Sequence, residues 1–454
     1  MLYVTIILYH IFRGLSSLYP LYILIFYGLF EPEALKLGVY HKYANFARGL
    51  MKSTDGNPPA LLDPFAGGGA IPLEAQRLGL EAHASDLNPV AVMINKAMIE
   101  IPPKFAGQPP VNPIARRQSG VKWTGARGLA EDVRYYGEWM KREAFERIGH
   151  LYPKVKDEHG QEHTVIAWIW ARTVKCPNPA CGCEMPLASS FVLSKKKGKE
   201  AYVQPIIEGK TIRYEVKYGK NVPEPTKTAR GAKFKCICCG ELANLGHVRS
   251  EAQSGHCGAA LMAVVAEAKG GKLFITPGGE QLEASRQVPP GNLELGTMPT
   301  NPRWFSPPLY GITEYQQMFT DRQIATLNEL CSLLEEMQSL AEADGCSQEY
   351  SQALRVYLAF VIDKIVAYST SFGLWRSDHE SFERIYGRQA IAMVWITLKS
   401  TLREKNFSTI SLKACANAFP ILPQMQGSPH NMMLKRIMDC VKSWFRQTRR
   451  IMTT

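Results

Sequence analysis

Two cysteine pairs are the residues whose types and spacing most directly predict chemistry. Cys176 and Cys181 are separated by Pro-Asn-Pro-Ala, Cys236 and Cys239 are separated by Ile-Cys, and a glycine follows each pair. Four thiolates arranged as a tetrahedron bind Zn²⁺ when two such turns come together, and the glycines permit the tight turns. The spacing therefore predicts a zinc ribbon, which would be structural because four protein ligands leave no open position for catalysis.

Other residues near these pairs leave the ligand set open. Cys183, Cys238, His247 and Cys257 could replace a ligand, and the alternative is that the cysteines are free or buried without a chemical role. The eleven cysteines do not indicate a secreted disulfide scaffold, because such scaffolds are short and cysteine-dense whereas these are spread over 454 residues. We therefore expect a reducing, cytoplasmic location.

A lysine run, residues 194–199 (SKKKGK), lies between the two pairs. It could contact phosphates, although such a run is more often a solvated turn. The net charge of +12 also suggests nucleic acid as a partner. However, residues 396–454 hold ten Lys or Arg against two Asp or Glu, so residues 1–395 are close to neutral.

A glycine-rich loop is the second feature that predicts chemistry. Residues 63–69 read DPFAGGG and lie between a short apolar stretch and residues 71–78, which have helical apolar spacing. Glycines let the backbone turn tightly and approach a ligand without Cβ clashes. Asp86 ends the next apolar stretch, where a carboxylate can accept hydrogen bonds from ribose hydroxyls. The alternative is an ordinary strand-to-helix turn with a surface aspartate.

This loop resembles the S-adenosylmethionine-binding motif of amino-methyltransferases, which act on exocyclic nitrogens. A phosphate-binding loop would need Gly-Lys-Ser or Gly-Lys-Thr, which is absent. The resemblance implies that the first acid and the glycine backbone surround the methionine part, that the second acid holds the ribose, and that Leu87 lies near the adenine. The implied cofactor-binding residues are Asp63, Phe65, Ala66, Gly67, Gly69, Asp86 and Leu87.

Apolar spacing predicts the elements that position these residues. Residues 60–62, 71–78 and 81–85 form a strand, helix and strand with parallel pairing, which favours a doubly wound, Rossmann-like α/β sheet. Residues 175–246 suggest a small β-rich insert, and residues 100–120 a linker. The remaining expectations are a strand at residues 165–174 and helices at residues 128–148, 321–337, 350–370 and 382–395.

Several segments in order resemble bacterial and archaeal adenine-specific DNA methylases that contain a zinc ribbon, a family with an N-terminal DUF1156 domain. The resemblance covers about residues 35–395. It implies a class I methyltransferase core with a β-rich zinc-ribbon insert and a helical region, S-adenosylmethionine and structural Zn²⁺ as cofactors, and DNA as partner. The glycine-rich loop at residues 63–69, called the donor loop below, and the second cysteine turn are two of the matching segments. The others are LEAQRLG, SDLNPVAV, TVKCPNPACGCEMPL, WFSPPLYG, FTDRQ and GRQAIAMVW.

The catalytic motif of such methylases is missing. It reads Asp-Pro-Pro-Tyr, in which the Asp side chain and a Pro carbonyl accept hydrogen bonds from the target amino group and the Tyr stacks on a flipped base. Residues 57–59 (NPP) lack the aromatic residue, and residues 306–310 (SPPLY) lack the amide or acid. We interpret both as decoys and assign no catalytic residue.

The C-terminal segment suggests an explanation. Residues 446–454, back-translated and read in another frame, permit Pro-Asp-Pro-Pro-Tyr-Tyr-Asp-Asn, and the same shift at residues 395–402 continues the family pattern. We therefore hypothesise a single-base loss near codon 395, after which the chain is out of frame.

These features divide the chain into five segments. Residues 1–30 are apolar but interrupted, leaving about 17 uninterrupted residues where a bilayer span needs roughly 20, so we expect no stable membrane association. The segments are an apolar N-terminus at 1–34, the S-adenosylmethionine-binding half at 35–150, the zinc-ribbon insert at 165–250, a helical or target-recognition region at 251–395, and an out-of-frame tail at 396–454.

The expected function is methyl transfer to adenine N6 in DNA, with this chain as a catalytically incomplete fragment. One alternative is an RNA or guanine amino-methyltransferase, because the donor loop does not distinguish substrates. An alternative of another class is a non-catalytic zinc-ribbon nucleic-acid-binding protein, which the lysine run and the missing motif suit. The sequence identifies no restriction or defence partner.

Overall fold

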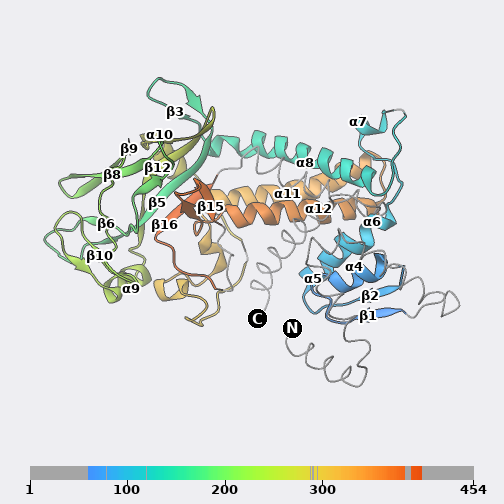
Figure 1. Ribbon diagram of the computed structural model, residues 1–454, viewed down its shortest axis with the longest axis horizontal. Coiled ribbons are helices and arrows are strands. Elements are labelled where there is room, and N and C mark those ends of the chain that lie inside the picture. The colour runs from blue at the N-terminus through green and yellow to red at the C-terminus, as the bar shows by residue number, and fades with distance from the viewer. Residues whose placement is uncertain are drawn as a thin grey trace, which may run out of the picture. The chain divides into compact units, whose positions relative to one another are not determined.

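The computed structural model describes residues 60–400, except residues 78, 119, 287, 289, 290, 294 and 384–389 (Figure 1). The described chain is mixed α/β and divides into two compact units, with the boundary between Glu100 and Ile101. The predicted apolar N-terminus, residues 1–34, lies outside the described part. Among the described helices, none is long and apolar enough to cross a membrane.

The first unit contains the predicted strand, helix and strand. β1 (Leu61–Asp63) and β2 (Ala82–Ala84) pair in parallel, with Asp63 opposite Ala84. Parallel neighbours need a crossover connection, and α4 (Ala70–Arg77) lies within it. The βαβ prediction is therefore confirmed, and the sheet formed by the described residues of this unit consists of these two strands.

A second helix, α5 (Pro89–Asn95), follows β2 and continues into the π-helical turn η1 (Lys96–Glu100). Asn88 caps its start, because the Asn88 side chain accepts a hydrogen bond from the Val90 N–H at 3.0 Å. Pro89 occupies the first turn, where its missing N–H costs no helical hydrogen bond. The buried residues of α5 are Val90, Ala91, Ile94 and Asn95.

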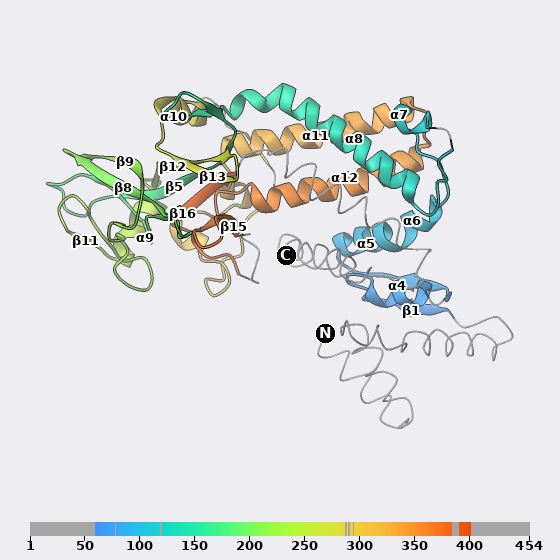
Figure 2. The ribbon, with the colours of Figure 1, turned by 45° about the horizontal axis from the view of Figure 1, so that its top comes forward.

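Three long helices, each packed against the other two, form the helical part of the second unit (Figures 1 and 2). They are α8 (Arg127–Ile148), α11 (Asp321–Ala343) and α12 (Gln348–Tyr368). Thr320 and Gln323 form a capping box at the start of α11, and the Ser347 side chain caps α12 by accepting from the Tyr350 N–H. All three predicted long helices are confirmed: apolar spacing predicts each of them, and side-chain caps add to α11 and α12, whereas α8 starts without one.

A buried carboxylate on α8 holds the segment that precedes this helix. Asp132 accepts hydrogen bonds from the N–H groups of Val111 and Asn112, both at 2.9 Å, and from the Tyr350 hydroxyl at 2.6 Å. Burial raises the pKa of Asp132, while these hydrogen bonds oppose that effect. The predicted linker is thus attached to the helices, and it contains two short helices, α6 (Ile101–Lys104) and α7 (Pro113–Arg116).

The largest sheet has the strand order β13-β12-β5-β16, with β6 also paired to β5, and all its pairings are antiparallel. Its strands are β5 (Val165–Lys175), β6 (Glu184–Pro186), β12 (Gly258–Ala268), β13 (Gly271–Ile275) and β16 (Ile396–Ser400). β5 is central and buried over nearly its whole length. Because side chains alternate along a strand, Ile169 and Trp168 enter different core clusters on its two faces.

A second antiparallel sheet covers one face of β5. It contains β7 (Val192–Ser194), β8 (Ala201–Glu208) and β9 (Thr211–Tyr218). Val203 and Tyr214 from this sheet share a buried cluster with Ile169 of β5 and Met262 of β12. The β-rich character predicted for this part of the chain is therefore confirmed, and it draws on strands from both sides of residue 250.

Smaller elements complete the second unit. Three antiparallel pairs are β3 (Val155–Lys156) with β4 (Glu162–His163), β10 (Phe234–Lys235) with β11 (Leu242–Ala243), and β14 (Leu374–Arg376) with β15 (Ser381–Glu383). The remaining helical elements are α9 (Leu245–Gln253), α10 (Gly279–Arg286) and the 3₁₀ turns η2 (Gly149–Leu151), η3 (Pro307–Tyr310) and η4 (Tyr315–Met318).

The helix predicted at residues 382–395 is wrong at both of its described ends, and residues 384–389 lie outside the described part. Phe382 lies in the β14–β15 hairpin, Ile391 forms a parallel bridge with Phe305, and the Trp395 carbonyl accepts a hydrogen bond from the Arg172 N–H at 2.9 Å. A local hairpin at the first end, and pairing with segments distant in sequence at the second, override the apolar spacing. The first five residues of the hypothesised out-of-frame tail form β16 against β5, and residues 401–454 lie outside the described part.

Candidate metal centre and donor loop

The two predicted cysteine turns lie together in the second unit. The first starts where β5 ends, and the Cys176 N–H donates to the Cys183 carbonyl at 2.9 Å. The second connects β10 to β11, and the Cys236 N–H donates to the Glu241 carbonyl at 2.8 Å. Each turn is therefore closed by its own strand pair, which positions the sulfurs.

Glycine is required at one position of each turn. Gly182 and Gly240 follow the second cysteine of their turns and have φ angles of 60° and 82°. This left-handed conformation is costly for residues with a Cβ atom. The prediction that these glycines relieve the tight turns is confirmed.

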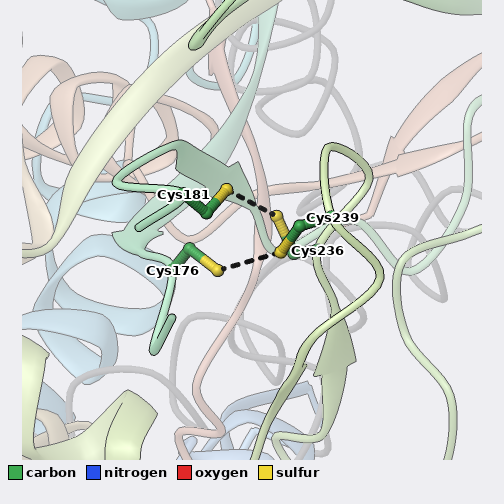
Figure 3. Close-up of side chains that lie close together, drawn as sticks. All are labelled: Cys176, Cys181, Cys236 and Cys239. Atoms are coloured by element: carbon green, nitrogen blue, oxygen red, sulfur yellow. Dashed lines mark hydrogen bonds between the residues drawn. The ribbon is translucent and has the colours of Figure 1, made fainter. Parts of the chain in front are cut away.

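The four sulfurs have the spacing of a tetrathiolate site. The Sγ atoms of Cys176 and Cys239 are 3.6 Å apart and those of Cys181 and Cys236 are 4.0 Å apart (Figure 3). All four sulfurs lie within 4.8 Å of one another. A tetrahedral ion with a Zn–S distance of about 2.3 Å has sulfur–sulfur edges of about 3.8 Å. The four cysteines thus form a cluster that could bind a metal ion, and its geometry is compatible with zinc.

The surroundings of the sulfurs affect their ionisation in opposite directions. Burial raises the pKa of the Cys176 thiol, and a hydrogen bond from the Asn178 N–H offsets only part of this effect. The pKa of the exposed Cys239 thiol is lowered, mainly because the Glu241 N–H donates to its sulfur. Since metals bind the thiolate form, a cation between the sulfurs would favour the ionised state that burial disfavours.

The other candidate ligands do not join this set of four. His247 Nε2 lies 2.8 Å from the carbonyl oxygen of Lys175, and Cys257 Sγ lies 3.9 Å from that of Gly258. A second group, made by the sulfurs of Cys183, Cys236 and Cys238, also lies within 4.8 Å. Its closest pair, Cys183 and Cys238, has an Sγ–Sγ distance of 2.8 Å. The spacing of the cysteines in the sequence did not indicate that Cys183 and Cys238 lie so close together.

The SPPLY segment is part of the core beside the metal centre. Tyr310 is 7% exposed, and its ring contacts that of Trp395 with 5.1 Å between centroids. The Trp395 ring also contacts that of Phe234, which precedes the second cysteine turn, at 5.4 Å. Tyr310 is thus a core residue in this structure.

The glycine-rich loop, residues 63–69, leads from the carboxyl end of β1 to α4 and is hydrogen-bonded to the residues that follow β2. Asp86 accepts a hydrogen bond from the Gly67 N–H at 2.8 Å through one carboxylate oxygen and from the Asn88 N–H at 2.9 Å through the other. Asp63 accepts from the Phe65 N–H at 3.2 Å. Both acidic residues therefore lie at the same edge of a parallel sheet, which is where ligands bind in open α/β sheets.

The loop and the residue after Asp86 carry large apolar side chains that are exposed. Phe65 is 69% exposed and Leu87 is 92% exposed. The Asn95 side chain donates to the Gly67 carbonyl at 3.0 Å, while its buried Oδ1 atom has no hydrogen-bond partner among the residues that the structure describes. Hydroxyl groups could reach the remaining lone pairs of the Asp86 carboxylate, and a flat ring could contact the exposed side chains.

The remaining residues of the implied cofactor set shape the loop. Ala66 is buried, and its N–H donates to the Ser85 carbonyl at 2.9 Å. Gly67 and Gly69 have φ angles of 53° and 73°. These contacts bring the backbone of the loop onto the end of β2 and explain the requirement for glycine.

The lysine run is partly a structural element. Lys196 donates to Glu380 at 2.6 Å, and Ser194 donates to the same buried carboxylate at 2.7 Å. These hydrogen bonds attach the turn after β7 to the β14–β15 hairpin. The side chains of Lys195, Lys197 and Lys199 are exposed and could reach phosphates.

No family model matches this chain, and no match was found among curated proteins or among solved structures.

Proposed function

We propose that this chain derives from an S-adenosylmethionine-dependent DNA amino-methyltransferase, and that its first unit is the donor-binding part of a doubly wound class I core. The observation that carries the proposal is the 2.8 Å hydrogen bond from the Gly67 N–H to Asp86. This bond places a glycine turn and a carboxylate at one edge of a parallel βαβ unit, where nucleotide-like ligands bind.

Each residue of the loop has a distinct role in this proposal. S-adenosylmethionine, when bound, supplies an activated methyl group. The Asp86 carboxylate would accept hydrogen bonds from the ribose hydroxyls, and Leu87 would lie near the adenine. Asp63 and the backbone of Gly67 and Gly69 surround the methionine part.

Calorimetry with S-adenosylmethionine tests the donor site. Asp86→Ala should weaken binding roughly 10- to 100-fold, because hydrogen bonds to a charged acceptor contribute about 1.5–3 kcal/mol. Leu87→Ala should also weaken binding, and it should leave stability unchanged because Leu87 is exposed. Leu62→Ala is the matched control, since Leu62 is a 68% exposed leucine of the same unit outside the implied cofactor set. Equal affinities for all four chains, or no binding by any, would refute the assignment.

We propose that the chain binds the donor without transferring its methyl group, because the Asp-Pro-Pro-Tyr motif is absent. Sequencing the gene from codon 380 to past codon 454, and reading all three frames, tests the frame hypothesis, which requires this motif in the shifted frame. A frame-restored chain should methylate adenine in DNA. Methylation of RNA alone, or of guanine, would instead favour the alternative amino-methyltransferases.

A non-catalytic nucleic-acid-binding protein is the second candidate. The observation in its favour is that residues 195–235, which lie between the two cysteine turns in the sequence, hold twelve Lys or Arg against four Glu. Phosphate contacts from such a segment would give binding that weakens steeply with salt. Salt-dependent DNA binding, together with no heat of S-adenosylmethionine binding, would favour this function over the first.

We further propose that the four-cysteine cluster holds a structural Zn²⁺ through Cys176, Cys181, Cys236 and Cys239. The sulfur spacings of 3.6 and 4.0 Å support this assignment. The ion would connect β5 to the β10–β11 hairpin and would leave no coordination position open to a substrate.

A further inference from the structure

A pair of cysteines lies directly beside the candidate zinc ligands. Cys183 follows the first cysteine turn and is completely buried, and Cys238 lies within the second turn and is partly exposed. Their Sγ atoms are 2.8 Å apart. The two thiols therefore meet across the same two turns that present the four sulfurs of the metal centre.

The short distance distinguishes this pair from metal ligands. Two thiolates on one tetrahedral zinc ion are about 3.8 Å apart, which is about 1 Å longer than the observed separation. A disulfide has a sulfur–sulfur distance of about 2.05 Å, so an approach of less than 1 Å would form the bond. The observed sulfur–sulfur distance of 2.8 Å is thus closer to the bond length of a disulfide than to the separation of two thiolates on one zinc ion.

We propose that Cys183 and Cys238 form a redox-active dithiol that is converted by peroxide into a disulfide across the metal centre. The inference concerns residues outside the donor loop and does not depend on methyl transfer. Cys238 is the accessible partner and reacts first, whereas the buried Cys183 resolves the product.

Peroxide oxidises the two thiols in two chemical steps. The Cys238 thiol first releases its proton, and the resulting thiolate attacks one oxygen of hydrogen peroxide. The O–O bond breaks, the leaving hydroxide takes up the released proton, and the products are Cys238 sulfenic acid and water. The Cys183 sulfur then attacks the sulfenic sulfur, an S–S bond forms, the S–O bond breaks, and a second water leaves with the Cys183 proton. Overall, two thiols lose two electrons and two protons, and one peroxide is reduced to two waters.

Disulfide mapping on the zinc-loaded full chain tests this proposal. Trypsin cleaves after Lys175 and Lys195, and after Lys235 and Arg249, so each turn yields one peptide with three cysteines. Reduced protein is treated with hydrogen peroxide, alkylated and digested. The expected product is a crosslinked peptide pair lacking two hydrogens, whose fragmentation assigns the bond to Cys183 and Cys238. Dithiothreitol should remove the link.

Matched variants separate this pair from the metal ligands. Cys183→Ala and Cys238→Ala should each abolish the crosslink and retain one zinc per chain, whereas Cys176→Ala should lose the zinc. Cys331→Ala, which removes an exposed cysteine of α11, should preserve both crosslink and zinc. Circular dichroism confirms that each variant is folded, and Cys183→Ser serves as a second replacement if Cys183→Ala does not fold.

Two results would overturn the proposal. Loss of zinc from folded Cys183→Ala or Cys238→Ala would identify these residues as metal ligands. Oxidised protein in which Cys183 remains open to alkylation after denaturation, with other cysteines crosslinked, would show that the observed proximity does not direct oxidation.

Discussion

A Cβ atom at Gly69 would lie 2.3 Å from the Oδ1 atom of Asn95. Asn95 in turn donates to the Gly67 carbonyl at 3.0 Å, so α5 and the donor loop are in direct contact. The last glycine of the loop is therefore required for packing as well as for its left-handed backbone.

We expect Gly69→Ala to destabilise the donor loop. Gly160→Ala is the control, because Gly160 has a similar φ of 79° but no neighbouring atom within 4 Å of its would-be Cβ. The free energy of unfolding should fall by about 1–3 kcal/mol more for Gly69→Ala, the usual cost of overpacking. Hydrogen exchange of peptides covering β1 and α4 measures this difference, and equal exchange in both variants would contradict the packing argument.

Zinc removal should loosen the second unit around the cysteine turns. Chelation, or Cys176→Ser, would leave the buried sulfurs without the cation that holds both turns. We expect a lower melting temperature and faster hydrogen exchange in β10 and β11, with little change in α8. Cys331→Ser should behave like the unmodified chain, because Cys331 lies on α11 outside the cluster. Unchanged melting after verified zinc loss would contradict a structural role.

Asp132→Ala should lower the free energy of unfolding by about 2–4 kcal/mol. The substitution removes the acceptor for two backbone N–H groups and for the Tyr350 hydroxyl, and buried donors left unsatisfied are costly. Glu146→Ala, at an exposed position of the same helix, should change it by less than about 0.5 kcal/mol. Urea denaturation compares the two, and similar losses would show that the hydrogen-bond network is not responsible.

The His163–Asp157 pair should make stability depend on pH. His163 Nε2 lies 2.9 Å from the Asp157 carboxylate, and Nδ1 lies 3.0 Å from the Glu267 carbonyl oxygen, so both ring nitrogens face acceptors. The hydrogen bond to Asp157 raises the pKa of His163, and that from His163 lowers the pKa of Asp157.

The signs of these shifts define the pH window. The stabilisation from His163 is fully present below the unfolded-state pKa of about 6.5 and is lost as the pH rises through the higher folded-state pKa. The stabilisation from Asp157 is present above about pH 4 and is lost as the pH falls through the lower folded-state pKa. Thermal melts of His163→Gln should therefore show a smaller stability loss above pH 6.5 than the unmodified chain. His150→Gln, at an exposed position, is the control and should retain the full loss.

The parts predicted correctly depend on local sequence. The βαβ unit around residues 63–69 follows from adjacent apolar stretches and glycines, and α11 follows from its capping residues and apolar spacing. The four-cysteine cluster was predictable although Cys176 and Cys239 lie 63 residues apart, because metal chemistry itself requires two such turns to meet.

The parts that were missed depend on long-range pairing. Residues 382–395 have the apolar spacing of a helix, yet Ile391 pairs with Phe305 and the Trp395 carbonyl with the Arg172 N–H, both distant in sequence. The contact between Cys183 and Cys238 also depends on how distant segments pair. Cys183 follows the first cysteine turn and Cys238 lies in the middle of the second, and no spacing rule predicts a contact between these two positions. Sequence alone predicts the kinds of elements present but not which of them become neighbours.

The ends of the cysteine-containing segment lie side by side, since Thr173 of β5 is directly opposite Gly258 of β12. Residues 174–257 are therefore, in topology, an enlarged hairpin loop between two paired strands. A segment of this kind can be inserted or removed without changing the order of the strands in the sheet, because insertions are tolerated where the two ends are close. The sheet of β7, β8 and β9 within this segment covers Ile169, however, so loss of the segment would expose one face of β5.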